Sequence, residues 1–258
     1  MNEKNKIHYK AVFISDTHLG FRGAQPLALL SFLKSIECDK LYLVGDILDV
    51  WEMKTNIHWD DACSEVVRRL LKMAHNGTKL IYLPGNHDEV IRQFLPITLS
   101  SNIEIVDQII HVTSSGDKFA VIHGDQYDAI VSNLKWLAIV GSKLYDWLIT
   151  ANGVLHKVRT KLGYSTYWSL AGYLKQKAKN AVNFISSFET ALIHHAKKLE
   201  CDGVICGHIH MAKITNQEGM IYANCGDWVE SLTAICEDES GQLKKINWHD
   251  INHHKEFK

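Results

Sequence analysis

The sequence predicts an α/β fold made of two sheets, with a largely helical insertion in the second half of the chain. In the first part of the chain, short apolar runs alternate with helical patterns, which is typical of parallel strands joined by crossover helices. From about Ile103 the pattern changes to short strands separated by tight turns, which favours a second sheet packed on the first. Between His123 and Gly203 there is little strand character, and apolar residues recur at three- and four-residue steps.

The first part of the chain predicts three parallel strands joined by two helices, in the order β-α-β-α-β. Three apolar runs are the expected strands: Lys10–Ser15, Leu41–Val44 and Leu80–Leu83. Apolar residues at helical spacing place the two helices between them, at Leu27, Leu30, Phe32, Leu33 and Ile36 and then at Val66, Leu70, Leu71 and Ala74. The second helix is expected to end near Gly77, and the third strand at Pro84-Gly85.

Further short apolar runs provide the strands expected after the change of pattern. They are Ile109–Thr113, Phe119–His123, Gly203–Cys206, Met220–Ala223, Leu232–Ile235 and Lys245–Trp248. Two amphipathic helices are indicated between them, by Leu134, Leu137, Gly141, Leu144 and Leu148 and by Leu170, Leu174, Ala178, Ala181, Ile185, Phe188 and Leu192. We interpret residues 126–200 as a helical cap inserted into a single domain that spans residues 1–258.

Composition and the first residues predict a globular cytoplasmic protein. The chain of 258 residues carries 28 Lys and Arg against 29 Asp and Glu, a net charge of −1, and 46% of its residues are hydrophobic. These values exclude a wholly disordered chain and argue against one that coats nucleic acid through bulk charge. We expect no transmembrane helix, because no stretch approaches the ~18 apolar residues that one requires. The amino terminus shows no apolar signal region.

The predicted cap differs in charge from the rest of the chain. Residues 131–180 hold eight basic residues and one acidic residue, with seven aromatic residues among them. Such a segment suits an anionic amphiphile or a membrane surface, and Arg159 and Lys161 are candidate phosphate contacts. The alternative is a pair of ordinary helices whose apolar stripes pack on the body and whose lysines are solvated. Nucleic acid is a further partner that this charge could attract, but we expect none.

Five short polar blocks each follow an expected strand. They are Asp16-Thr17-His18, Gly45-Asp46-Ile47-Leu48-Asp49, Gly85-Asn86-His87-Asp88, His123-Gly124-Asp125 and Gly207-His208-Ile209-His210. Open α/β sheets bind ligands at the carboxyl ends of their strands, so the blocks are expected to converge on one rim. Carboxylate, imidazole and amide ligands without a thiolate favour Mn²⁺, Fe or Zn²⁺, and one carboxylate can bridge two ions. Each block alone is a common turn or cap, but all five in order predict a site for two divalent metal ions.

The order DxH, GDxxD, GNHD, HG and GHxH resembles that of the calcineurin-like metallophosphoesterases over nearly the whole chain. The resemblance implies a two-sheet α/β sandwich with a dinuclear metal centre on one rim. By motif position, the ligands would be Asp16, His18 and His210 for one ion, Asn86, His123 and His208 for the other, and Asp46 between them. A hydroxide bridging the ions would attack phosphorus in line. His87 would be the catalytic residue that stabilises the transition state or protonates the leaving group.

A few other residues near these blocks, or near the end of the chain, have more than one interpretation. Asp49 and Asp88 each either orient a ligand histidine or cap a local turn. Trp51 either lines a substrate groove or belongs to the core. The adjacent pair His253 and His254 has no role that the pattern assigns.

Longer matches resemble one branch of this family, the UDP-2,3-diacylglucosamine pyrophosphohydrolases of lipid A biosynthesis. They are SDTHLG, LVGDILDVW, PGNHDEVI, the insertion after HGD, and ICGHIH followed by NCGDWVES. The resemblance implies cleavage of UDP-2,3-diacylglucosamine to UMP and diacylglucosamine 1-phosphate, with manganese as the usual metal. It also implies a cap that holds the acyl chains. With the basic cap, this places the protein peripherally at the inner face of the cytoplasmic membrane.

His87 stands where the biosynthetic enzymes typically have arginine. A guanidinium offers phosphate a planar, permanently charged fork, whereas an imidazole can titrate. The alternative hypothesis is therefore a dinuclear phosphodiesterase or phosphatase of the same fold that acts on another nucleotide or lipid phosphate. A non-catalytic scaffold is a third hypothesis, and the complete ligand set argues against it.

Overall fold

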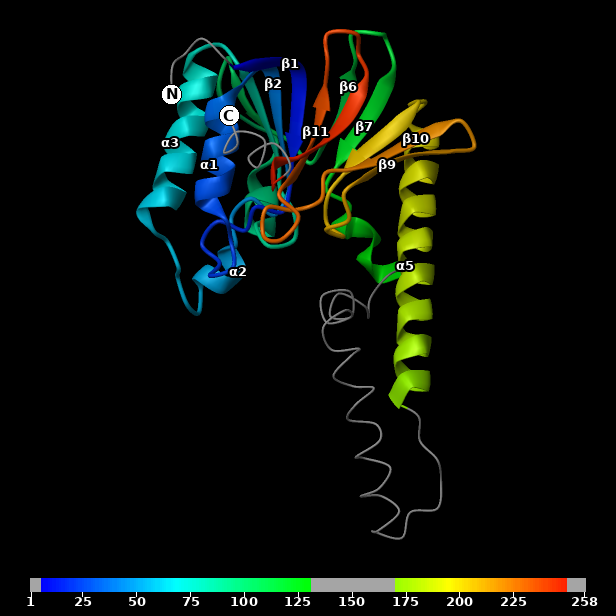
Figure 1. Cartoon of the computed structure of the whole chain (residues 1–258). Coiled ribbons are helices and arrows are strands. Elements are labelled where there is room, and N and C mark those ends of the chain that lie inside the picture. The colour runs from blue at the N-terminus through cyan, green and yellow to red at the C-terminus, as the bar shows by residue number, and fades with distance from the viewer. Residues whose placement is uncertain (1–5, 131–169, 250–258) are drawn as a thin grey trace, which may run out of the picture. The chain divides into compact units, whose positions relative to one another are not determined.

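A computed structural model describes residues 6–130 and 170–249 of the chain, except for the side chains of residues 128–130, 170–181 and 183. The chain divides into two compact units, one formed by residues 1–126 and 192–258 and the other by residues 127–191. Both sheets lie in the first unit (Figure 1). Of the predicted cap, residues 131–169 lie outside the described residues, and helix α5 (Leu170–Lys198) falls at the second of its two apolar patterns. The extent of the cap stays a prediction.

The first sheet has seven strands in the order β12-β11-β1-β2-β3-β5-β4. They are β1 (Ile7–Ile14), β2 (Ile36–Val44), β3 (Lys79–Leu83), β4 (Ile97–Ser100), β5 (Ile103–Ile105), β11 (Thr233–Glu237) and β12 (Leu243–Asn247). Strands β1, β2, β3 and β5 are parallel, and helices α1 (Pro26–Ser35) and α3 (Asp61–His75) form the first two crossovers. The predicted β-α-β-α-β unit is confirmed, although Ile36 begins β2 instead of ending the first helix.

The second sheet has five strands in the order β6-β7-β8-β10-β9. They are β6 (Gln108–Val112), β7 (Lys118–Ile122), β8 (Gly203–Cys206), β9 (Lys213–Gln217) and β10 (Met220–Asn224). Strands β7, β8 and β10 are parallel, so their carboxyl ends point the same way. The prediction of a second sheet is confirmed.

The structure corrects the number of strands and their assignment to sheets. The runs predicted at Leu232–Ile235 and Lys245–Trp248 form β11 and β12, and both belong to the first sheet because β11 pairs with β1. Strands β4 and β9 were not predicted, because their residues are mostly exposed or half-buried and show no apolar run. Strand β5 was missed because only three residues form it.

The remaining helical segments among the described residues are short. They are α2 (Val50–Met53) and the 3₁₀ helices η2 (Glu89–Phe94) and η3 (Asp125–Ile130). The first two follow the polar blocks after β2 and β3, and the third begins at the last residue of the block after β7. None of the helices in the described part of the chain has both the length and the apolar character that crossing a membrane requires.

Two hydrophobic cores lie on opposite faces of the first sheet. Val12 and Ile14 of β1 pack with residues of α1 and α3, whereas Ala11 and Phe13 pack against strands of the second sheet. Because residues 11–14 of β1 are buried on both faces, they form a continuous apolar run without the alternation of a half-exposed strand. The two cores hold the carboxyl ends of the central strands in fixed positions, and the polar blocks follow at those ends.

A buried polar network joins the two sheets. The His111 imidazole of β6 lies between the Tyr42 hydroxyl of β2, 3.0 Å from Nδ1, and the Glu237 carboxylate of β11, 2.8 Å from Nε2. All three side chains are almost fully buried. Burial lowers the pKa of His111, and the neighbouring Glu237 only partly opposes this. With His111 neutral, Tyr42 donates to Nδ1 and Nε2–H donates to Glu237, so every member of the network is satisfied.

Candidate dinuclear metal centre

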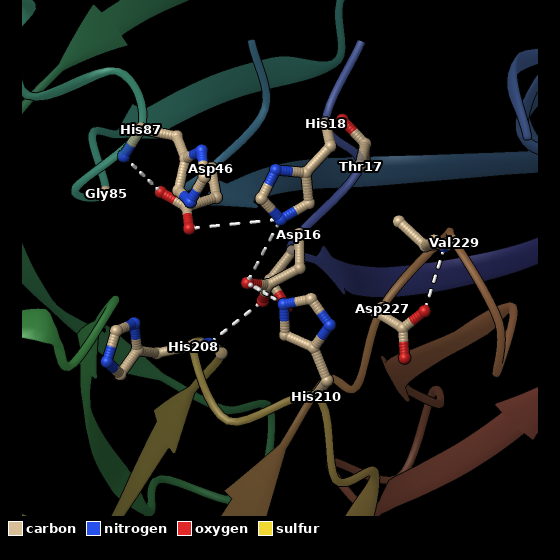
Figure 2. A network of polar contacts seen from close by, with 12 residues as sticks. Asp16, Thr17, His18, Asp46, Gly85, His87, His208, His210, Asp227 and Val229 are labelled. Carbon is tan, nitrogen blue, oxygen red and sulfur yellow. Dashed lines mark hydrogen bonds and ion pairs between the residues drawn. The ribbon is translucent and has the colours of Figure 1, made fainter. Parts of the chain in front are cut away.

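The five polar blocks meet where β1, β2, β3, β7 and β8 end. Figure 2 shows side chains from four of the blocks pointing toward one another. Among the described residues other than glycine, eight have a positive φ, and five of these are predicted metal ligands: Asp16, His18, Asp46, His208 and His210. Such backbone conformations are uncommon for residues with a Cβ and gather at functional sites, where the surrounding structure holds them. The positive φ values are therefore an observation, separate from the motifs, that points to the same five residues.

Two glycines of the motifs give the ligand side chains the space they need. A Cβ on Gly45, whose φ is +80°, would lie 2.2 Å from Cγ of His123. A Cβ on Gly85 would lie 2.2 Å from Oδ1 of Asp46. Both contacts are far shorter than real Cβ contacts, so glycine is required at these positions for steric reasons.

The first predicted ligand set is assembled in the structure. The ligand atoms of Asp16, His18 and His210 all lie within 4.8 Å of one another. Nε2 of His210 is 3.0 Å from Oδ1 of Asp16, and Nε2 of His18 is 4.0 Å from the same oxygen. The other oxygen of Asp16 accepts a hydrogen bond from the His208 amide at 2.9 Å, which fixes the carboxylate in this orientation.

The second set adjoins the first through Asp46. The ligand atoms of Asp46, His123 and His208 lie within 4.8 Å of one another, with Nε2 of His123 at 3.4 Å from Oδ2 of Asp46. The same oxygen is 4.0 Å from Nε2 of His18, which belongs to the first set. Asp46 is therefore placed between the two sets, as a bridging carboxylate would be.

Several buried polar atoms of these residues lack a hydrogen-bond partner in the described part of the chain, which bears on whether the residues fit metal ions. Nε2 of His18, Oδ1 of Asn86 and Nε2 of His123 are buried, and within the described residues they have no hydrogen-bond partner. Such atoms are rare in native proteins unless a ligand satisfies them. Nδ1 of His123 donates to the Val44 carbonyl at 2.8 Å, so Nε2, which faces Asp46, is the nitrogen that can ligate a metal ion once it has lost its proton. Nitrogen and oxygen donors without a thiolate suit divalent ions such as Mn²⁺, Fe or Zn²⁺, so the residues fit a metal pair.

The charges of the centre also favour cations. Burial would raise the pKa of Asp16, but the adjacent His210 holds it well below its usual range. Burial acts on Asp46 in the same direction, and His123 outweighs it. Both carboxylates are therefore ionised near neutral pH, the form in which they can ligate a metal.

Asp49 contacts two of the predicted site histidines. Its Oδ2 lies 3.0 Å from Nδ1 of His18, and its Oδ1 lies 2.9 Å from Nδ1 of His87. The carboxylate also accepts a hydrogen bond from the Glu52 amide and so caps α2. Asp49 therefore contacts a ligand histidine and also caps a local turn, the two interpretations that the sequence left open. Its effect on metal binding stays a prediction.

Replacing Asp49 with asparagine should weaken metal binding without removing the cap. Asparagine keeps an oxygen for the Glu52 amide but cannot accept from both imidazoles and carries no charge. We expect about a 10- to 100-fold loss in metal affinity and a matching rise in the Mn²⁺ concentration needed for hydrolysis. The measurement is a Mn²⁺ titration of activity, with Asp39→Asn at an exposed carboxylate of β2 as the control. An unchanged titration curve would show that Asp49 does not act on the centre.

Asp88 joins two of the polar blocks to each other. Its carboxylate accepts hydrogen bonds from the amides of Ile47, at 2.8 Å, and Gly85, and from the Tyr82 hydroxyl. Burial raises the pKa of Asp88, although the Tyr82 contact opposes this. Of the two roles considered for Asp88, these contacts fit the one that fixes the turns.

His87 lies at the rim of the centre beside an exposed tryptophan. The ring centroids of His87 and Trp51 are 4.6 Å apart, and Trp51 is 44% exposed, which excludes the core interpretation of this residue. The His87 amide donates to Asp46 at 2.8 Å, so the position of His87 depends on the bridging residue. The catalytic role of His87 and the substrate contact of Trp51 stay predictions. Arg159 and Lys161, the other predicted substrate contacts, lie outside the described residues.

Arg92 is a residue of the site that the sequence did not reveal. Its guanidinium donates to both oxygens of Asp125, at 2.6 and 2.7 Å, to Asp107 at 2.9 Å and to the Pro84 carbonyl at 2.8 Å. Pro84 precedes the block that carries Asn86, and Asp125 ends the block that carries His123. Arg92 thus ties together two loops that hold predicted ligands of the second ion.

Replacing Arg92 with lysine should loosen these two loops, because an ammonium group cannot reproduce the planar fork. We expect the affinity for one of the two ions to fall by about tenfold or more. Metal content after dialysis should drop from two ions per chain toward one, and Arg68→Lys, at an exposed arginine of α3, should keep both. Full retention of two ions in Arg92→Lys would refute this role.

Asp227, which was not among the predicted site residues, lies beside the centre as well. Figure 2 shows its side chain near His210. It follows β10 and accepts hydrogen bonds from the Val229 amide at 2.9 Å and the Ser231 hydroxyl at 2.7 Å. Its contacts hold the turn that follows β10 next to the first ligand set.

The chain is similar to a family of phosphoesterases and to proteins named as hydrolases. The family model described as calcineurin-like phosphoesterase matches residues 9–212. A UDP-2,3-diacylglucosamine hydrolase of Haemophilus influenzae (strain PittGG) is 24% identical over 241 residues, which cover 90% of this chain and 96% of that protein. Another, of Neisseria meningitidis serogroup A, is 26% identical over 240 residues, which cover 87% of this chain and 92% of that protein. Among solved structures, a novel archaeal phosphodiesterase covers 92% of this chain and 98% of its own, with a TM-score of 0.44 and 14% identity.

The family match includes all five polar blocks up to His210. Members use divalent metals, and the described residues present two adjoining clusters of histidine and carboxylate side chains that fit them. The chain therefore belongs to the calcineurin-like phosphoesterase family and is a phosphoester hydrolase.

Proposed function

We propose that the chain hydrolyses the pyrophosphate bond of UDP-2,3-diacylglucosamine and releases UMP and diacylglucosamine 1-phosphate. The observation that carries this proposal is the ligand arrangement around Asp46, which joins two sets of metal-ligating side chains. The choice of substrate is supported by relatives named UDP-2,3-diacylglucosamine hydrolase that align with this chain over nearly their full length. We take the metal to be Mn²⁺, with Fe or Zn²⁺ as substitutes that the same donor set accepts.

The side chains of the site would have distinct roles in holding the metal ions and in catalysis. Asp16, His18 and His210 would hold one ion, Asn86, His123 and His208 the other, and Asp46 both. When bound, two divalent ions neutralise the phosphoryl oxygens and lower the pKa of a water molecule positioned for in-line attack. His87, fixed through Nδ1 by Asp49, would donate a hydrogen bond or a proton to an oxygen of the reacting phosphate.

The basic segment at residues 131–180 would contribute to binding the amphiphilic substrate. Lysine and arginine attract anionic groups and membrane surfaces, and apolar helix faces can hold acyl chains. On this proposal Arg159 and Lys161 contact phosphate, and the protein acts peripherally at the inner face of the cytoplasmic membrane. Trp51, exposed beside His87, would form part of the substrate groove.

His87 is the residue that supports an alternative substrate. Its imidazole contacts the Asp49 carboxylate through Nδ1 and can titrate, whereas a guanidinium is permanently charged, so the site differs here from the arginine-bearing pattern. A dinuclear hydrolase with this feature would act on another nucleotide or lipid phosphate while keeping the same metal chemistry.

The test is turnover of UDP-2,3-diacylglucosamine by the purified chain with added Mn²⁺. A generic diester, bis(4-nitrophenyl) phosphate, and the Asp46→Asn variant run alongside. We expect UMP release that the variant loses. Turnover of the diester without UMP release would favour the alternative, a hydrolase that acts on another nucleotide or lipid phosphate. Turnover of neither compound would refute the proposed chemistry.

A further inference from the structure

A cavity lies next to the metal centre, where its lining residue Phe21 adjoins His18. Its volume is about 420 Å³, within the range of small-molecule sites. The loop between β1 and α1 and the loop between α2 and α3 form its walls. Six residues define it here as the Phe21–Trp59 pocket: Phe21, Arg22, Ile57, His58, Trp59 and Asp60.

Backbone contacts hold the two walls of this pocket together. The His58 amide donates to the Gly20 carbonyl at 3.1 Å, and the Phe21 amide donates to the His18 carbonyl at 2.9 Å. Gly20 has a φ of +99°, and a Cβ there would lie 2.9 Å from the Met53 side chain. The loops therefore pack closely enough to form the pocket before any ligand arrives, which lowers the ordering cost of binding.

The apolar lining of the pocket is exposed and suited to stacking. Ile57 is 60% exposed and Trp59 is 37% exposed, although both are large apolar side chains. Trp59 Nε1 donates to the Ser64 hydroxyl at 2.9 Å, which fixes the indole while part of the ring stays exposed. Grouped apolar surface around a cavity is typical of a binding site.

The polar lining distinguishes between two kinds of ligand. Arg22, His58 and Asp60 share the pocket with the aromatic rings, and Asp60 uses one oxygen to cap α3 through the Cys63 amide at 2.8 Å. An acyl chain would bury these groups without hydrogen-bond partners, which is costly. A planar heterocycle with carbonyl and N–H groups at its edge can both stack on the rings and pair with the polar side chains.

The pocket is within reach of a phosphate held at the metal centre. The ring of Phe21 lies 6.5 Å from the ring of His18, a predicted metal ligand. The same loop is hydrogen-bonded to the polar block after β2, because the Leu19 amide donates to the Ile47 carbonyl and the Asp49 amide donates to the Leu19 carbonyl, both at 2.9 Å. In a nucleotide whose phosphate lies near His18, the ribose would extend toward Phe21.

We propose that the Phe21–Trp59 pocket binds the nucleobase of the substrate, so that the nucleoside monophosphate half of the molecule lies along the loop between β1 and α1. The proposal rests on the proposed function only in taking the substrate to be a nucleotide. It adds a specificity site within the first compact unit, distinct from the predicted cap.

The experiment compares two ligands that share a phosphate and differ in the base. UMP and ribose 5-phosphate are titrated by calorimetry into the Mn²⁺-loaded full chain. Base stacking should make UMP bind roughly 5- to 150-fold more tightly than ribose 5-phosphate. Trp59→Ala should reduce this ratio to within about twofold, and Trp59→Phe should keep most of it because phenylalanine still stacks. Leu99→Ala, at an exposed apolar residue of β4, is the control and should keep the full ratio. Thermal unfolding confirms that each variant is folded.

Two results would overturn the pocket assignment. One is a ratio near one in the unmodified chain, and the other is a ratio that Trp59→Ala leaves unchanged. If Trp59→Ala weakens diacylglucosamine 1-phosphate binding and spares UMP, the pocket holds an acyl chain and the inference is wrong. If the chain turns over UDP-2,3-diacylglucosamine but binds UMP no more tightly than ribose 5-phosphate, the pocket assignment is wrong and the proposed function stands. If it binds UMP more tightly but does not turn over UDP-2,3-diacylglucosamine, the proposed substrate is wrong and the pocket assignment stands.

Discussion

Asp46→Asn is expected to lower phosphoester hydrolysis by roughly 10³-fold or more while the fold is kept. Asp46 is the only predicted ligand whose carboxylate lies between the two histidine sets, with His123 at 3.4 Å and His18 at 4.0 Å. Loss of a single hydrogen bond to a developing charge already costs about 10²–10³-fold, and this substitution weakens the hold on both ions at once. Asparagine keeps an oxygen for the His87 amide, so the loop that carries His87 should stay in place.

Steady-state kinetics and metal content together check this expectation. Asp61→Asn is the matched control, since Asp61 is an exposed carboxylate at the start of α3 that contacts no predicted ligand. The control should keep activity and two ions per chain, and the circular dichroism of both variants should match that of the unmodified chain. Activity of Asp46→Asn within a few-fold of normal would remove the bridging role from the account.

Glu237→Ala is expected to be strongly destabilising, by about 3–5 kcal/mol, because it breaks a buried charged network by removing one partner. The His111 Nε2–H loses its acceptor at 2.8 Å, and the Ser114 amide loses its acceptor at 2.7 Å. His111 stays buried, so water cannot replace the carboxylate there, whereas the exposed Ser114 amide can bond to solvent. The loss is a large share of the 5–15 kcal/mol by which native domains are stable.

Urea unfolding measures this effect, with Glu239→Ala as the matched control. Glu239 lies just past the same strand and pairs with His8 and Lys10 at the surface, where solvent screens such pairs. We expect the midpoint for Glu239→Ala to change little and that for Glu237→Ala to fall sharply. Equal midpoints for the two variants would mean that the Tyr42–His111–Glu237 network does not hold the sheets together.

The sequence predicts the centre of the fold well, because its central strands are buried on both faces. Stretches of this kind are continuous apolar runs, as in residues 11–14 of β1, and each is followed by a polar block that the parallel topology brings to the same rim. The predicted convergence of Asp16, His18, Asp46, His123 and the GHxH histidines follows from that topology.

Other features could not be predicted, because they depend on partners distant in the sequence. Strand β11 belongs to the first sheet only because it pairs with β1, more than two hundred residues earlier. Arg92 lies in an ordinary stretch, and its acidic partners Asp107 and Asp125 follow 15 and 33 residues later. The two contacts of Asp49 with His18 and His87 likewise require the three-dimensional arrangement.

Anomalous X-ray diffraction from crystals of the Mn²⁺-loaded chain tests for the metal pair around Asp46. We predict two anomalous peaks, one among Asp16, His18 and His210 and one among Asn86, His123 and His208, with Asp46 in contact with both. A single peak, or peaks away from these side chains in crystals of active protein, would contradict a dinuclear centre around Asp46.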